Sequence, residues 1–163
     1  MRKFIQTALM MLLILPMAAC WKITDPNDPR FDPAAFDFND YKNHEELAEV
    51  LRGLFKPGDS REDVEKVLVE AGRVKVPHEI GKDKELKYPL GGYGGIPHTQ
   101  YEDYKTKIEN YHQHSYRTVL YQKQMKGTWS PAAWEVFVFY DSKEQVEQMM
   151  SMDILVFSDG EQE

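Results

Sequence analysis

Residues 134–141, with the sequence WEVFVFYD, constrain the fold most strongly because both faces of an extended chain would be apolar here. Alternate residues line the first face: Trp134, Val136, Val138 and Tyr140. The second face carries Glu135, Phe137, Phe139 and Asp141. A strand with two apolar faces is typical of the interior of a sheet rather than of its edge. The sequence therefore predicts a central strand at this position.

The segments on either side supply its expected neighbours. Residues 116–122 suit a strand, and residues 146–156 place Val146, Met150, Met152, Ile154 and Val156 on one face. Helical spacing fits residues 142–150 in part, but the alternation continues through Val156 and favours a strand. Three strands in an antiparallel meander are predicted. Val74 and Val76 suggest a short strand that Pro77 ends, and residues 104–111 fit either a helix or a strand.

Two amphipathic helices are predicted before these strands. The first begins near Asn43, with Glu46 as its capping partner, and ends at Pro57-Gly58. The second begins at Ser60, with Asp63 three residues on, and Gly72 supplies its end. Their apolar residues follow helical spacing: Leu47, Val50, Leu51, Leu54 and Phe55, then Val64, Val67, Leu68 and Ala71. The short break between them predicts a helical hairpin.

These elements predict an α+β domain in two layers, a two-helix hairpin packed on a three-stranded antiparallel sheet. The domain is expected to span residues 43–157 and to include a glycine-rich loop at 81–100. Residues 158–163 would form an acidic tail.

The start of the chain has the pattern of a secretory signal. Arg2 and Lys3 precede an apolar run from Phe4 to Leu15, which breaks at Pro16. A membrane span needs about 20 apolar residues, so a transmembrane anchor fits this run poorly.

Residues 15–20, LPMAAC, resemble the lipobox of bacterial lipoprotein precursors. The resemblance implies a diacylglycerol on the thiol of Cys20, cleavage after Ala19 that removes residues 1–19, and usually acylation of the new amino terminus, with palmitate as the expected chain. Trp21 stands where an aspartate would resemble the inner-membrane retention signal. The expected location is therefore the outer membrane, facing the periplasm. Met17 is bulkier than the residue usual at its position.

Residues 20–42 would follow as a lipidated cysteine and a tether rich in Asp and Pro. Asp-Pro occurs three times in it, which favours a semi-stiff, extended chain that holds the domain off the membrane. Its aromatic residues, Phe31, Phe36, Phe38 and Tyr41, leave two alternatives open: they pack on the domain or they form a docking strip for a partner.

Charge and cysteine content exclude several classes of function. The formal net charge is −7, and removal of residues 1–19 with Arg2 and Lys3 makes it −9. An acidic protein of this size is a poor nucleic-acid binder and is repelled by anionic lipid head groups. Cys20 is the single cysteine, so no disulfide forms within the chain.

The second helix also carries a family pattern. Gly58, Ser60, Val64, Leu68 and Gly72 match a glycine-turn and helix pattern, so the domain resembles the SmpA/OmlA (BamE-like) outer-membrane lipoproteins. That resemblance implies a helical pair on a three-stranded sheet and an accessory role in β-barrel assembly or envelope integrity. Two features depart from the family: Arg73 replaces a usual proline, and the glycine-rich loop is inserted.

Candidate ligands and contacts are few. His112 and His114 on a strand, with His98 from the loop, could approach a zinc ion, but no carboxylate or thiol has a telling spacing, and surface histidines are common. Residues 91–95, GGYGG, lack the lysine and helix of a phosphate-binding loop. Tyr88, Tyr93 and Tyr101 could make this loop a recognition surface, and a solvated connection is the alternative.

No arrangement of nucleophile, base and acid is apparent, and the acidic residues of the helices (Glu45, Glu46, Glu49, Glu62 and Glu65) fit a solvated face. We therefore expect a non-enzymatic protein without metal or cofactor. It would be a periplasmic interaction or scaffold domain, held by the membrane through its lipid and binding other envelope proteins. The alternative is a small-ligand or inhibitor-type binding module, which would need an apolar pocket under the glycine-rich loop.

Overall fold

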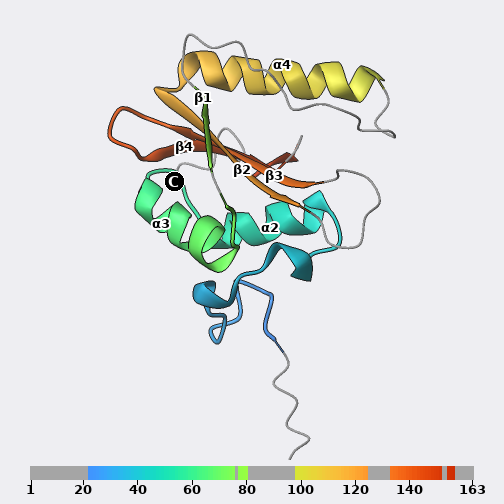
Figure 1. Ribbon diagram of the computed structural model, residues 1–163, viewed down its shortest axis with the longest axis vertical. Coiled ribbons are helices and arrows are strands. Elements are labelled where there is room, and N and C mark those ends of the chain that lie inside the picture. Colours follow the sequence, from blue (N-terminus) through green and yellow to red (C-terminus); the bar gives the residue numbers. More distant parts are fainter. Residues whose placement is uncertain (1–21, 76, 81–97, 125–132, 152–153, 157–163) are drawn as a thin grey trace, which may run out of the picture.

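The computed structural model describes residues 22–75, 77–80, 98–124, 133–151 and 154–156 (Figure 1). The elements are η1 (Pro33–Ala35), η2 (Phe38–Asp40), α2 (His44–Leu54), α3 (Arg61–Glu65), η3 (Lys66–Ala71), β1 (His78–Ile80), α4 (His98–His114), β2 (Arg117–Gln124), β3 (Ala133–Tyr140), β4 (Val146–Ser151) and β5 (Ile154–Leu155). Among the described residues, no helix is both long and apolar enough to cross a membrane.

The sheet contains five strands in the order β1-β2-β3-β4-β5, and every neighbouring pair is antiparallel. β3 pairs with β2 on one side and β4 on the other, and all eight of its residues are buried. The predicted central strand is therefore confirmed. The α+β class is confirmed as well.

Three layers, rather than the predicted two, make up the domain. α4 covers one face of the sheet, and α2 and α3 cover the other (Figure 1). The predicted pair of helices did not include α4. Of the two alternatives for residues 104–111, the helix is the one observed, and few of the described side chains of α4 are apolar and buried. Ile108 is fully buried, and Tyr111 packs partly against the same cluster.

The prediction of three strands was also incomplete. β1 follows Pro77 directly, so the proline precedes a short edge strand instead of ending one at residues 74–76. β5 has two residues and pairs with the end of β4.

A β-bulge in β4 corrects the predicted alternation of residues 146–156. Tyr140 pairs with Val146 and Phe139 with Gln148, so Glu147 is the extra residue. Val146 and Met149 consequently face the helical hairpin, whereas Met150 faces α4. The prediction that the even-numbered apolar residues of this segment share one face is wrong, because the inserted residue moves the residues after it to the opposite face.

Two cores lie on the two faces of the sheet. The larger core joins the sheet to α2, α3 and η3, and includes Leu47, Leu51, Val64, Leu68, Val119, Val136, Val138 and Met149. The smaller core lies under α4 and contains Ile108, Leu120, Phe137, Phe139 and Met150.

Both helices of the hairpin begin as predicted. The Oδ1 atom of Asn43 accepts a hydrogen bond from the backbone N–H of Glu46 at 2.8 Å, and the hydroxyl of Ser60 accepts one from the N–H of Asp63 at 3.2 Å. The second helix continues from α3 into the π-helical turn η3.

The end of the second helix differs from the expected glycine cap. Gly72 has an ordinary φ of −70°, and Arg73 takes the left-handed conformation with a φ of 59°. Gly72 is needed for space instead: a Cβ atom there would lie 2.7 Å from Cε2 of Phe38 and 2.6 Å from the carbonyl oxygen of Leu68.

Residues 22–42, here named the docked segment, pack beneath the helical hairpin at the end of the molecule opposite α4 (Figure 1). Phe36, Phe38 and Tyr41 are buried in the larger core, and η1 contacts η3. For these three aromatic residues the packing alternative is confirmed: the ring of Phe38 lies against Gly72, and Phe36 packs against the rings of both Phe38 and Tyr41.

Candidate functional site

Three of the four predicted site residues, Cys20, Tyr88 and Tyr93, lie outside the described residues. Tyr101 lies in the first turns of α4, and the structure describes its backbone. His98 is the first residue of that helix. The glycine-rich segment therefore connects the edge strand β1 to the start of α4.

The predicted histidine arrangement is wrong because His112 and His114 lie on a helix, where residues two apart point in different directions. Nδ1 of His112 lies 2.8 Å from the hydroxyl of Thr118 in the protein interior, whereas Nδ1 of His114 lies 2.7 Å from the carbonyl oxygen of Asn110 on an exposed surface. Within the described ranges, no three His, Cys, Asp or Glu side chains form a group that could hold a metal ion.

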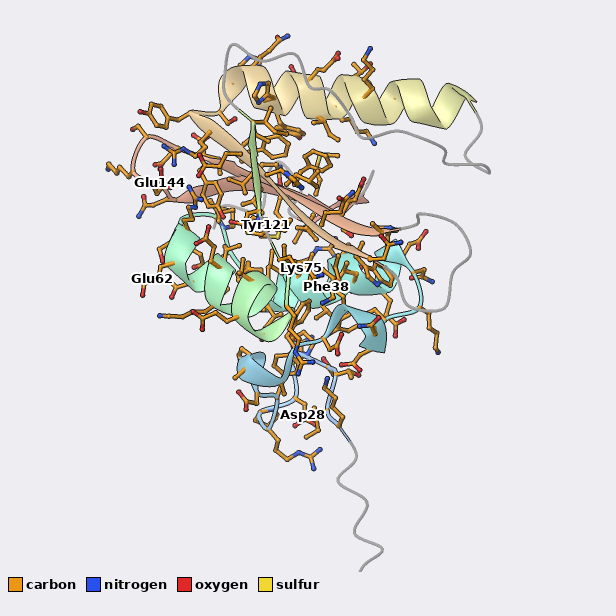
Figure 2. All side chains as sticks on the ribbon, in the orientation of Figure 1. Asp28, Phe38, Glu62, Lys75, Tyr121 and Glu144 are labelled. Atoms are coloured by element: carbon orange, nitrogen blue, oxygen red, sulfur yellow. The ribbon has the colours of Figure 1, made fainter. Side chains whose placement is uncertain are left out.

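The densest polar arrangement among the described residues is a cluster of five charged side chains. The charged cluster consists of Arg61, Glu65, Glu79, Arg117 and Glu144. It joins the start of α3, the edge strand β1, the start of β2 and the turn between β3 and β4. Glu144 marks its position above α3 in Figure 2.

Arg61 is the centre of the charged cluster. Its guanidinium group contacts Glu65 and Glu79 at 2.7 Å each. A third contact reaches Glu144 at 3.2 Å. The side chain is 20% exposed, so these bonds form in a partly desolvated position where they are stronger than at an open surface.

Arg117 closes the charged cluster from the other side. One of its nitrogens lies 3.0 Å from Glu144 and 3.5 Å from Glu79. The guanidinium groups of Arg61 and Arg117 therefore both contact the carboxylates of Glu79 and Glu144. Through Glu79, these contacts hold the strand β1 in place. Because Glu79 is the middle residue of β1, the charged cluster fixes the strand from which residues 81–97 depart.

The same contacts shift the pKa values of Arg61 and Glu79. Partial burial by itself lowers the pKa of Arg61, but its hydrogen bonds to Glu65, Glu79 and Glu144 outweigh this effect and raise it above the ordinary value. The hydrogen bond from Arg61 lowers the pKa of Glu79. Both shifts favour the charged forms of Arg61 and Glu79, and the arrangement of the five side chains suits a structural clamp.

Backbone hydrogen bonds attach the helical hairpin to the β3–β4 turn next to the charged cluster. The N–H of Arg61 donates to the carbonyl of Glu144 at 2.9 Å, and the N–H of Gly58 donates to that of Val146 at 2.8 Å. Gly58 has a φ of 95°, a conformation that favours glycine. The turn itself places Glu144 in the left-handed region, with a φ of 62°.

Two buried tyrosines are linked to the charged cluster through Glu65. The hydroxyls of Tyr121 and Tyr140 are 2.9 Å apart, and Tyr121 donates to Glu65 at 3.4 Å. Burial raises the pKa of both phenols above their ordinary range, so both are neutral donors at physiological pH.

Sequence reasoning did not find the charged cluster. It placed Glu65 on a solvated helix face, but that carboxylate contacts Arg61 and accepts from Tyr121. The spacing of four residues between Arg61 and Glu65 is the one local signal for it. The remaining members come from three other elements, so a pattern within one segment could not reveal them.

Comparison of the chain with protein-family models, with curated proteins and with solved structures found no match.

Proposed function

We propose that this protein is a lipoprotein attached through Cys20 to the outer membrane, with a periplasmic α+β domain that binds other envelope proteins. The observation that carries the proposal is the sequence LPMAAC at residues 15–20, placed after a basic start and a short apolar run. Accessory work in β-barrel assembly or envelope integrity is the role that the BamE-like helix pattern suggests.

The edge strand β1 is the surface best suited to a protein partner. Within the described residues it pairs with β2 alone, so its other edge has backbone donors and acceptors that a partner strand can use. The charged cluster holds Glu79 in place, which lowers the conformational entropy that binding would cost. Residues 81–97, which contain Tyr88 and Tyr93, follow β1 directly in the sequence and include the predicted recognition loop.

The lipid anchor is tested by Cys20→Ser. The unchanged protein should fractionate with membranes, and its amino-terminal peptide should carry diacylglycerol by mass spectrometry. The variant should lose both properties, because serine lacks the thiol that the lipid donor alkylates. A membrane-bound variant or an unmodified Cys20 would contradict the anchor.

The partner surface is tested by photo-crosslinking in cells. A photoreactive residue at the exposed position His78 of β1, or at Tyr88, should capture identified envelope proteins, β-barrel assembly components in particular. The same residue at the exposed position Glu62 of α3 is the matched control and should capture far less. Equal capture at all three positions, or capture at none, would contradict the proposed surface.

A further inference from the structure

The way the docked segment is folded points to a fixed orientation on the membrane. We propose that this surface, residues 22–42, lies against the lipid head groups and that α4 faces away from them. The inference rests on the proposed lipid attachment at Cys20. It replaces the expectation of a tether that holds the domain off the membrane.

The docked segment is held to the domain from its first described residues. Lys22 forms an ion pair with Asp40. Pro26 packs on α2 at Gly53, where a Cβ atom would lie 2.5 Å from Cγ of the proline. Phe36 and Phe38 then enter the larger core. Residues 22–42 therefore follow the surface of the domain and do not form a free chain.

The remaining length between the lipid and the domain is short. Trp21 is the one residue between Cys20 and Lys22. Two peptide steps reach at most about 7 Å, even when fully extended. A free chain from residue 20 to residue 42 would instead span about 25 Å on average. Once Cys20 carries acyl chains inserted in a bilayer, Lys22, where the docked segment begins, must lie close to the head groups.

The arrangement of the layers gives this contact a direction. The docked segment lies at one end of the molecule and α4 at the other, with the helical hairpin and the sheet between them (Figure 1). Asp28 marks the membrane-facing end in Figure 2. The orientation leaves α4, and the start of α4 to which residues 81–97 connect, facing the periplasm.

The charge of the docked segment indicates which interaction keeps it at the membrane. Residues 22–42 contain five aspartates and three basic residues, so anionic lipids would not attract them. Insertion of the acyl chains, and not head-group charge, must keep the surface at the membrane. The same orientation is therefore expected on a purely zwitterionic bilayer.

The test uses the full lipidated protein in phosphatidylcholine vesicles that contain a head-group-labelled acceptor lipid. Cys20 is acylated and no other cysteine exists, so one introduced cysteine accepts a donor dye selectively. Ala34→Cys places the dye on the exposed surface of η1, and Lys107→Cys places it on the exposed surface of α4. Energy transfer then reports the distance of each dye from the head groups.

We expect the dye at position 34 to lie about 25 Å closer to the head groups than the dye at position 107, because two layer spacings of about 10 Å and the packed segment separate them. Inserting 20 Gly and Ser residues between Trp21 and Lys22 keeps every docking contact but adds about 25 Å of reach. The difference between the two dyes should then disappear.

Two results would overturn the orientation while leaving the lipid anchor intact: vesicles that carry the protein but give equal transfer from both dyes, or stronger transfer from position 107. A third result would be self-quenching between dyes at position 34 with little transfer to the head groups. It would show that this surface contacts a second copy of the chain, and it would also overturn the proposed orientation. Failure of the protein to float with vesicles, with Cys20 unmodified, would remove the proposed anchor and this inference together.

Discussion

The hydroxyl of Tyr140 lies 2.9 Å from that of Tyr121 inside the larger core, and Tyr121 donates in turn to the carboxylate of Glu65. Because Tyr121 gives its proton to Glu65, Tyr140 must be the donor between the two phenols. These two hydrogen bonds connect the strands β2 and β3 to α3.

Tyr140→Phe should lower the free energy of unfolding by about 1 kcal/mol at neutral pH, since one buried hydrogen bond is lost and Tyr121 keeps its other partner. Urea unfolding monitored by circular dichroism measures the change. Tyr116→Phe is the control, because Tyr116 is 57% exposed. Equal urea midpoints for the two variants would contradict the role of the buried pair.

Alkaline pH should destabilise the protein through the same tyrosines. Burial raises the pKa of Tyr121 and Tyr140 in the folded state, so the unfolded chain loses these protons first. The stabilisation is complete below the ordinary tyrosine pKa of about 10 and is lost as pH rises above it. Replacing both residues by Phe should flatten the fall in stability above that pH, measured by urea unfolding across a pH series. An unchanged slope would contradict the assignment.

Arg61→Ala should lower the free energy of unfolding by about 1–2 kcal/mol after allowance for solvent screening, because three carboxylates lose a shared partner. Lys66→Ala is the control: Lys66 lies on the same helical segment and its ion pairs with Glu62 and Asp63 are exposed. Little change is expected for it. A larger loss for Lys66→Ala than for Arg61→Ala would contradict the clamp.

The charged cluster also predicts a response to acid. Arg61 lowers the pKa of Glu79 in the folded state, so the stabilisation is complete above the ordinary glutamate pKa of about 4.3. It is lost as pH falls through the lowered folded value. Glu79→Gln should therefore remove part of the acid dependence below that pH, as followed by thermal unfolding. The same acid slope in both proteins would exclude this contribution.

Gly72→Ala should destabilise the domain by about 1–3 kcal/mol, because the added methyl group would overlap the ring of Phe38 in the core. Arg73→Gly should act in the opposite direction and stabilise by about 1 kcal/mol, since a non-glycine residue at a φ of 59° is strained. Thermal unfolding distinguishes them. A stabilised Gly72→Ala variant would show that the helix end has room to move.

The hairpin and the central strand could be predicted from the sequence because their signals are local. Asn43 and Ser60 cap their helices within three residues, and the alternation of residues 134–140 is contained in one strand.

Arg73 stands where the BamE-like pattern has a proline. Proline does not fit this position, because its ring fixes φ near −65° and Arg73 has a φ of 59°.

The errors came from features that depend on distant contacts. Glu147 is an ordinary polar residue, and its bulge arises from how Tyr140 and Val146 pair across the sheet. α4 has a weak apolar stripe, so its helical state depends on packing over Phe137 and Phe139. The charged cluster brings together residues from four elements, and Arg61 and Glu144 are 83 positions apart.

The unequal size of the two cores has a consequence for how the domain opens. Of the described side chains of α4, Ile108 is the one fully buried apolar residue, whereas the helical hairpin and the docked segment contribute many to the opposite face. Local opening free energies follow the amount of buried contact. Amide protons of α4 should therefore exchange with deuterium through a sub-global fluctuation that leaves the hairpin and strands β2–β4 protected.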